Sequence, residues 1–147
     1  MASDDKPVRR SRGFVDAIPH NKALGMRAVE LDRGEAVFVL PYDAKLVGNP
    51  DTGVLHGGAI TALLDACSGA SVFSALTEWV PIATLDLRID YLRAAEAGRD
   101  VIAHATCYKT TRNVAFTRAI AYHDDPADPI ASSVGTFMLS TKPGTTK

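Results

Sequence analysis

The chain has 147 residues, a length that fits one domain with its own hydrophobic core. Its formal net charge of −1 gives no general attraction to nucleic acid or to an anionic membrane. The two cysteines, Cys67 and Cys107, lie in apolar stretches without a CxxC pattern or a cysteine–histidine cluster, so we expect reduced core residues and no metal site.

The N-terminal dozen residues are charged and contain few apolar side chains. Such a composition predicts a disordered tail over residues 1–12, and it lacks the apolar stretch of a signal peptide. One domain is expected over residues 13–141, followed by a short tail over residues 142–147. With no signal peptide and no convincing membrane span, the chain is expected to be cytoplasmic and free of membrane contacts.

Turn and strand signals divide the first part of the chain. The expected elements are a short helix at residues 14–18, strands at residues 26–32 and 35–40, and a loop at residues 41–52. Pro19 is expected to stop the short helix. Arg33 and Gly34 form the tight turn of a hairpin between the two strands. The loop leads into the stretch around which the chain is organised.

A long helix is predicted between Leu55 and Leu76, where the residues are small or apolar and no proline occurs. Asp65 is the only charged residue between His56 and Leu76. A helix that is apolar or small on all sides is normally buried, and a carboxylate in its middle is costly unless it is paired or used. Asp65 is therefore the leading candidate for a functional residue, and a carboxylate paired with an arginine is the alternative.

Four strands are predicted after the helix, at residues 82–91, 101–108, 114–122 and 130–139. The first of them alternates, with Leu85, Leu87, Ile89 and Tyr91 expected on one face and Thr84, Asp86, Arg88 and Asp90 on the other. Six antiparallel strands with one apolar face and one helix to cover it predict an α+β fold, a curved sheet wrapped around the helix.

The run LHGGAITALLDACSG, residues 55–69, resembles the signature of hotdog-fold acyl-CoA thioesterases of the PaaI-like branch. The resemblance extends over residues 24–139. It implies the hotdog fold, hydrolysis of an acyl-CoA to free acid and coenzyme A, and no cofactor besides the coenzyme A of the substrate. It also implies a homo-oligomer, a dimer or a dimer of dimers with shared active sites, in which two subunits join their sheets.

By this resemblance Asp65, nine residues after His56, takes the place of the family's catalytic carboxylate. It acts either as a general base on water or as a nucleophile that forms a mixed anhydride. Gly57 is the candidate oxyanion donor through its backbone N–H at the helix start, although Gly57 and Gly58 are also explained by relief of crowding. His56 is expected to contact the thioester carbonyl or to have a structural role only.

Two further polar residues match the family pattern less closely. Asn49 corresponds to an asparagine near the reacting carbonyl, but it stands seven residues before His56 where several relatives have six. A loop-capping role is the alternative for Asn49. Thr84 corresponds to a serine or threonine that positions water and comes from the partner subunit, and a solvent-facing strand residue is its alternative.

Basic residues are expected where the phosphates of coenzyme A bind. The candidates are Arg88, Arg93, Lys109 and Arg112, and the turn KTTRN at residues 109–113 resembles the family's nucleotide-contacting turn. Each of them is also explained as a solvated surface charge. Gly69, one turn after Asp65, indicates space for a medium-chain or aryl acyl group, and close helix packing is the alternative.

Two other function classes compete with hydrolysis. A non-catalytic acyl-CoA-binding or sensing protein would use the same cavity, but it would have no need for the costly Asp65. A hotdog dehydratase would pair a histidine with an acid at another place, and no such pattern occurs in the sequence. Acyl-CoA thioester hydrolysis therefore remains the leading interpretation.

Overall fold

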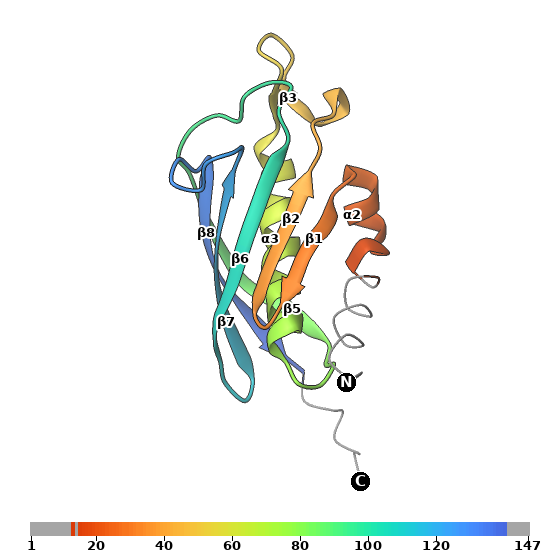
Figure 1. Cartoon of the computed structure of the whole chain (residues 1–147), viewed down its shortest axis with the longest axis vertical. Helices are drawn as coiled ribbons and strands as arrows, with labels where there is room; N and C mark the ends of the chain where they lie inside the picture. Colours follow the sequence, from red (N-terminus) through yellow and green to blue (C-terminus); the bar gives the residue numbers. More distant parts are fainter. Residues whose placement is uncertain (1–12, 14, 141–147) are drawn as a thin grey trace, which may run out of the picture.

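One antiparallel sheet curves around a single long helix (Figure 1). The computed structural model describes residue 13 and residues 15–140. The sheet contains β1 (Arg27–Asp32), β2 (Glu35–Leu40), β5 (Ile82–Tyr91), β6 (Val101–Thr110), β7 (Val114–Tyr122) and β8 (Ala131–Leu139). Their order across the sheet is β1-β2-β6-β7-β8-β5, which leaves β1 and β5 at the two edges. The predicted α+β fold and its six-stranded sheet are confirmed.

The helix α3 (Gly57–Ala75) lies against the concave face of the sheet. Small residues line this face. Five buried alanines lie there on neighbouring strands: Ala36, Ala103, Ala105, Ala119 and Ala121. The short side chains let α3 approach the sheet closely, while its large apolar residues fill the remaining space. The core between helix and sheet is therefore formed mainly by bulky residues of α3 over an alanine-rich surface.

Cys67 lies in the middle of this core and is fully buried. Its thiol donates to the backbone carbonyls of Ala36 and Ala103 at 3.4 Å and 3.5 Å. Burial raises the pKa of the Cys67 thiol, so that the reactive thiolate is disfavoured. The expectation of a reduced core cysteine is in keeping with these contacts, and Cys67 is unsuited to act as a nucleophile.

The turn between β1 and β2 follows the sequence-based prediction. Arg33 has φ 42° and Gly34 has φ 89°, so both central residues have positive φ values. A two-residue hairpin turn with positive φ at both positions matches the right-handed twist of the strands. A Cβ on Gly34 would also lie 3.2 Å from the carbonyl oxygen of Cys107, which adds a steric reason for glycine.

One expectation for the N-terminal third of the chain is confirmed and another is wrong. The short helix predicted at residues 14–18 is present in its described part, since Val15 and Asp16 are helical, and it ends before Pro19. Pro19 also begins a further helix, α2 (Pro19–Leu24), because proline fits the first helical position, where its missing N–H would have no acceptor within the helix. The region predicted as a plain loop contains the 3-10 helix η1 (Ala44–Leu46) and a small hairpin of β3 (Val47–Asn49) and β4 (Val54–Leu55). Phe14 and the tails predicted at residues 1–12 and 142–147 lie outside the described residues.

Strand β5 does not alternate regularly, contrary to the prediction. The pairing of β5 with β8 shifts between Thr84 and Asp86, which marks a β-bulge at Leu85. Thr84 faces α3 before the bulge, and Ile89 packs against the core after it. Leu85 itself is 53% exposed, so the bulge moves it out of the apolar face.

By length and composition α3 is the one described helix that could cross a membrane. However, 56% of its most apolar stretch is buried inside the protein. The same apolar residues serve as the contact surface with the sheet. The apolar character of α3 is thus explained by its place in the core.

Candidate functional site

Asp65 and Thr84 form the centre of the candidate site. Asp65 projects from the middle of α3 toward β5, and Thr84 Oγ1 donates to Asp65 Oδ1 at 2.8 Å. Asp65 has no ion-pair partner among residues 13 and 15–140, so the alternative of an arginine-paired carboxylate finds no support there. The carboxylate is held by a neutral hydroxyl, which leaves its charge available.

The two residues belong to the same chain, and the expectation that Thr84 comes from the partner subunit stays a prediction. The bulge in β5 produces this contact, because it turns Thr84 toward the helix while Arg88 faces the opposite side of the sheet. A strand without the bulge would place Thr84 and Arg88 on one face. The bulge therefore brings Thr84 into contact with Asp65 of its own chain.

A mainly apolar cavity of about 270 Å³ adjoins Asp65 and Thr84. We call it the Asp65 cavity, and its lining residues are Val15, Ile18, Asp65, Ala66, Gly69, Ala70, Phe73, Ile82, Thr84 and Phe137. Pockets that enclose a drug-sized ligand have volumes of roughly 300–1,000 Å³. The Asp65 cavity is slightly smaller than this range, so it has room for an apolar group beside the carboxylate but not for a complete ligand that includes a nucleotide.

Gly69 lines this cavity, as the sequence-based hypothesis requires. A Cβ at Gly69 would lie 3.6 Å from Phe137 Cε1 and 3.7 Å from Ile82 Cδ1, both ordinary contact distances. Larger side chains would extend into the space between these residues. The position thus tolerates a methyl group, and the missing side chain of Gly69 keeps the cavity open.

The start of α3 is built around His56. The Nδ1 atom of His56 accepts a hydrogen bond from the N–H of Gly58 at 2.8 Å, so the imidazole caps the helix. A Cβ on Gly58 would lie 2.8 Å from the same Nδ1 atom, which explains glycine at this position. Gly57 is the first residue of α3, where a backbone N–H has no acceptor within the helix.

The Tyr91 side chain contacts the first turn of α3, and this contact was not predicted from the sequence. Its hydroxyl donates to the carbonyl oxygen of Gly57 at 2.8 Å and lies 2.5 Å from Thr61 Oγ1. The Tyr91 ring also lies 3.4 Å from the position that a Cβ on Gly57 would take. The end of β5 is therefore fastened to the first turn of α3 by one tyrosine.

Asn49 lies at the tip of the β3–β4 hairpin. Its Oδ1 atom accepts a hydrogen bond from the N–H of Asp51 at 3.0 Å, and its carbonyl oxygen accepts one from the N–H of Gly53 at 2.8 Å. These bonds are typical of an asparagine that caps a turn. The side chain is engaged within its own turn, as the loop-capping alternative requires, and the catalytic role of Asn49 stays a prediction.

Comparison with known proteins identifies the family. Residues 52–130, which contain Asp65 and Thr84, match the Thioesterase superfamily. The chain belongs to this superfamily. The sequence-based prediction of a hotdog-fold thioesterase is thereby confirmed.

Relatives of this thioesterase include proteins of assigned activity. The chain is 32% identical over 139 residues to the medium/long-chain acyl-CoA thioesterase YigI of Escherichia coli K12, covering 86% of this chain and 88% of YigI. A crystal structure of a Pseudomonas aeruginosa protein is 46% identical, with a TM-score of 0.80, and the match covers 89% of this chain and 97% of that one.

A mutant of the phenylacetic acid degradation protein PaaI from Thermus thermophilus is also similar. Its structure is 28% identical, with a TM-score of 0.72, and the match covers 82% of this chain and 98% of that chain. PaaI-type proteins are thus among the structural neighbours of this thioesterase, in agreement with the branch indicated by the sequence.

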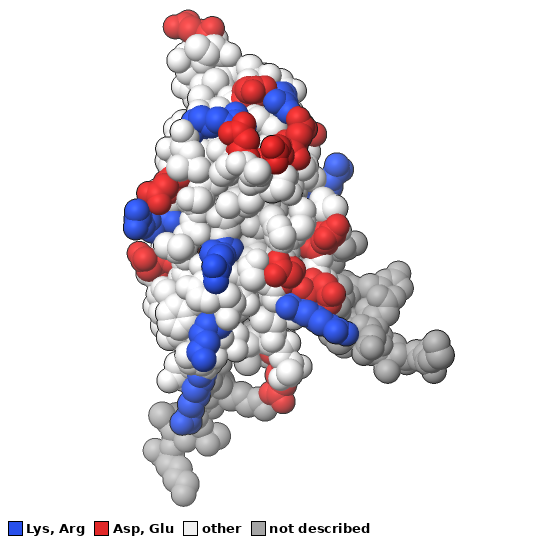
Figure 2. Space-filling view, turned by 60° about the vertical axis from the view of Figure 1, so that its left-hand side comes forward, with Lys and Arg blue, Asp and Glu red and all other residues white. Residues whose placement is uncertain are grey.

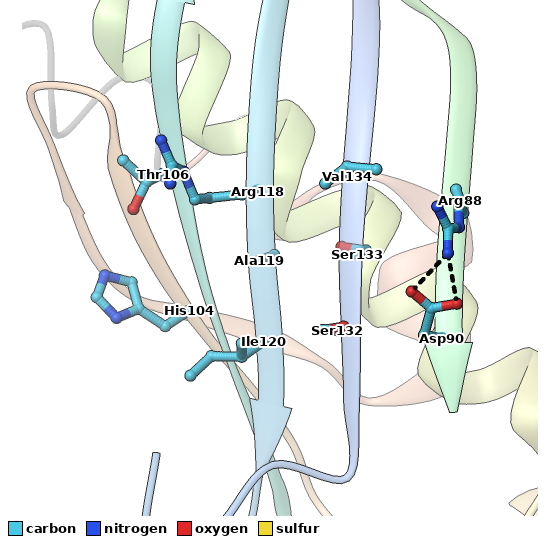
Figure 3. Close-up of a pocket in the computed structure, with 10 residues that line it drawn as sticks. All are labelled: Arg88, Asp90, His104, Thr106, Arg118, Ala119, Ile120, Ser132, Ser133 and Val134. Atoms are coloured by element: carbon cyan, nitrogen blue, oxygen red, sulfur yellow. Dashed lines mark hydrogen bonds and ion pairs between the residues drawn. The ribbon is translucent and has the colours of Figure 1, made fainter. Parts of the chain in front are cut away.

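Two of the four basic candidates of this thioesterase have partners away from the Asp65 cavity. Arg88 pairs with Asp90 at 3.2 Å on the outer face of the sheet, where both line a separate hollow of about 440 Å³ (Figure 3). Figure 3 shows α3 behind the sheet, on the opposite side from these side chains. Arg93 pairs with the carboxylate of Asp128 at 3.3 Å and donates to its carbonyl oxygen at 3.0 Å.

The other two candidates, Lys109 and Arg112, form no ion pair within the described part of the chain. Arg112 lines a surface hollow of about 510 Å³ together with Leu76 and Thr77, which follow the end of α3. Basic side chains follow one another down one face of the molecule toward its lower end (Figure 2). The assignment of any of the four to coenzyme A stays a prediction.

No group of three histidine, cysteine, aspartate or glutamate side chains that could hold a metal ion occurs in residues 13 and 15–140. The polar side chains beside the Asp65 cavity are a single carboxylate and a single hydroxyl. The chemistry open to this arrangement is base or nucleophilic catalysis by Asp65.

Proposed function

We propose that this thioesterase hydrolyses acyl-CoA to a free acid and coenzyme A, with Asp65 as general base or nucleophile. The observation that carries the proposal is the Asp65 carboxylate, which has no ion-pair partner among the described residues and is held by Thr84 at the edge of a mainly apolar cavity. An apolar site with one costly carboxylate fits a reaction on an apolar acyl group. The name of the relative YigI, a medium/long-chain acyl-CoA thioesterase, supports the same substrate class.

The acyl group is proposed to occupy the Asp65 cavity. Its lining is apolar except for Asp65 and Thr84, and its size of about 270 Å³ suits a medium-chain or aryl group. The nucleotide part of coenzyme A lies outside, where Lys109 and Arg112 are the proposed phosphate contacts. No cofactor is proposed for the reaction.

Thr84 is proposed to orient the carboxylate. Its hydroxyl binds one oxygen of Asp65, and the other oxygen is the one proposed to act on water or on the carbonyl. In one route Asp65 removes a proton from water, which attacks the thioester carbonyl and expels the coenzyme A thiolate. In the other route Asp65 attacks the carbonyl and expels the coenzyme A thiolate, and water then hydrolyses the mixed anhydride.

The backbone N–H of Gly57 is the proposed oxyanion donor. Gly57 and Asp65 stand eight residues apart on α3, which corresponds to about 12 Å along a helix axis. One carbonyl group is too small to contact both within a single chain. We therefore propose that a dimer shares its active sites, so that Asp65 of one subunit meets the Gly57 N–H of the other.

The test of the function is hydrolysis measured with purified protein, a set of acyl-CoAs and a thiol reagent. Asp65→Asn keeps the shape of the side chain and removes its charge, so we expect a fall in kcat of about 10²-fold or more. Asp32→Asn, at the exposed β1–β2 turn, is the matched control and should retain activity. Near wild-type turnover in folded Asp65→Asn would make Asp65 structural.

This assay also separates hydrolysis from simple binding. A wild-type protein that binds acyl-CoA but releases no coenzyme A would favour the non-catalytic alternative.

A cytoplasmic location is proposed as well, since the apolar helix α3 is packed into the core.

A further inference from the structure

The segment before α2 forms part of the Asp65 cavity. Val15 and Ile18 line the cavity together with Asp65 and Thr84, although they precede Asp65 in the chain by about fifty residues. We call residues 15–18 the wall segment. Val15 is only 3% exposed, so its side chain is packed inside rather than resting on the surface.

Two hydrogen bonds fix the wall segment to the rest of the domain. Asn21, itself 5% exposed, donates through Nδ2 to the carbonyl oxygen of Val15 at 3.0 Å. Asp16 accepts a hydrogen bond through Oδ1 from the N–H of Ala28 in β1, also at 3.0 Å. The first bond is buried and the second is partly buried. Because such bonds are costly to break, these anchors hold Val15 and Ile18 in a defined position.

The other lining residues belong to α3, β5 and β8, which are fixed by the packing of helix and sheet. A change among them would disturb the core as well as the cavity. The wall segment lies outside the sheet and α3 (Figure 1). Val15 itself belongs to the hydrophobic core, whereas Ile18 is only half-buried, so Ile18 is the residue of the wall segment whose size is less restricted by the core.

We propose that Val15 and Ile18 are specificity-determining residues that limit the length of the acyl chain bound beside Asp65. The inference rests on the proposed function, in which the acyl group occupies this cavity. The residues act by contact with the far part of an unbranched or aryl acyl group, and they take no part in the chemical step. Their apolar surfaces also disfavour acyl groups with polar substituents.

The test compares two opposite changes at Ile18 with a control. Ile18→Ala enlarges the cavity and Ile18→Phe reduces it, while Ile120→Ala makes the same change at a half-buried isoleucine on the outer face of the sheet. The values of kcat/KM are measured for acetyl-, octanoyl- and dodecanoyl-CoA. Melting temperatures show whether each variant is folded.

Ile18→Ala should raise the ratio of dodecanoyl to octanoyl turnover by roughly tenfold, the usual effect of small changes in an apolar pocket. Ile18→Phe should lower octanoyl-CoA turnover by a similar factor and leave acetyl-CoA nearly unchanged. Ile120→Ala should keep the wild-type length profile. An unchanged profile in both folded Ile18 variants would overturn the proposal.

Binding of alkyl-CoA thioethers separates this inference from the proposed function, because a thioether has no carbonyl to hydrolyse. The Kd of octyl- and dodecyl-CoA thioethers should follow the same order in the Ile18 variants even if the wild-type protein proved inactive. Equal Kd changes in Ile18 and Ile120 variants would contradict the role of the wall segment. If Ile18→Ala does not fold, Ile18→Val, which removes a single methyl group, gives a smaller shift in the same direction.

Discussion

Thr84 reaches Asp65 because one extra residue, Leu85, bulges out of β5. β-Bulges redirect side chains next to functional sites, and here the bulge turns a strand threonine toward the helix. The hydroxyl fixes the rotamer of a carboxylate that has no ion-pair partner in the described residues. We therefore expect Thr84 to affect the rate because it orients the Asp65 carboxylate, and not because it transfers a proton.

Thr84→Val keeps the shape of the side chain and removes the hydroxyl, so kcat should fall, but by less than in Asp65→Asn. Thr84→Ser retains the hydroxyl and should restore most of the rate. Measurement of kcat and KM for all three variants tests this order. Equal rates in the valine and serine variants would show that the hydroxyl does not orient Asp65.

A second prediction at the residue scale concerns Gly69 and the size of the acyl group. The missing side chain of Gly69 leaves room in the Asp65 cavity between Phe137 and Ile82. Gly69→Val should therefore preserve hydrolysis of acetyl-CoA and exclude medium-chain or aryl substrates. Gly69→Ala is the milder control, since its methyl group meets only ordinary contacts. A uniform loss with every substrate, together with a lower Tm, would instead identify a packing glycine.

At the scale of elements, the first turn of α3 is held from three directions. His56 caps it, the backbone N–H of His56 donates to the carbonyl oxygen of Leu46 at 2.8 Å, and Tyr91 binds the carbonyl oxygen of Gly57. The N–H groups at a helix start favour negative charge only if they are held in position. The contacts of His56 and Tyr91 provide that positioning.

Gly57→Pro tests the proposed oxyanion donor with little disturbance of the helix. Proline lacks an N–H, and it is well suited to the first position of a helix. His56 has ψ 133°, an extended conformation that is compatible with a following proline. We expect kcat to fall by about 10²–10³-fold, the usual effect of losing one oxyanion donor.

The control is the melting temperature, which should stay close to the wild-type value because the cap and the helix remain. Wild-type kcat in a folded Gly57→Pro protein would show that another group stabilises the oxyanion.

At the scale of the whole molecule, the exposed edge of the sheet at β5 is the feature that favours association with a second copy of the chain. Strand β5 is ten residues long and lies at the edge, and large apolar side chains along it or just after it are exposed: Leu85 by 53%, Tyr91 by 52% and Leu92 by 55%. Long uncovered edges of this kind favour pairing with a second sheet. Pairing of β5 with the same strand of a second copy is thus the proposed dimer contact.

Shared active sites make the dimer testable by complementation. Asp65→Asn and Gly57→Pro subunits are each expected to be inactive, but a mixed dimer contains one intact site. Random mixing of equal amounts should restore about a quarter of the wild-type activity, since half of the dimers are mixed. Refolding the two variants together and separately, followed by the hydrolysis assay, gives the comparison.

No recovery in confirmed mixed dimers would mean that Asp65 of one subunit and Gly57 of the other do not act on the same thioester. Sedimentation of the wild-type protein supplies the necessary background. A stable and active monomer at micromolar concentration would remove the basis for a shared site.

The sequence by itself determined the sheet and the helix, and it predicted Asp65 as the leading functional residue. Strand alternation and the apolar run without proline are local patterns, and the lone charge of Asp65 stands out because burial of an unpaired carboxylate is costly. The helix cap joins His56 to Gly58, two residues that are close in sequence, although the hydrogen bond itself was not predicted. Local signals therefore sufficed to predict where the centre of the candidate site lies.

Only the tertiary structure decided which side chains gather around that centre. The bulge in β5 depends on the pairing with β8, and a shift of one residue exchanges the two faces of a strand. The contact of Tyr91 with Gly57 and the lining of the cavity by Val15 and Ile18 join segments far apart in sequence. Such contacts arise from the packing of helix and sheet, which no local pattern of residues specifies.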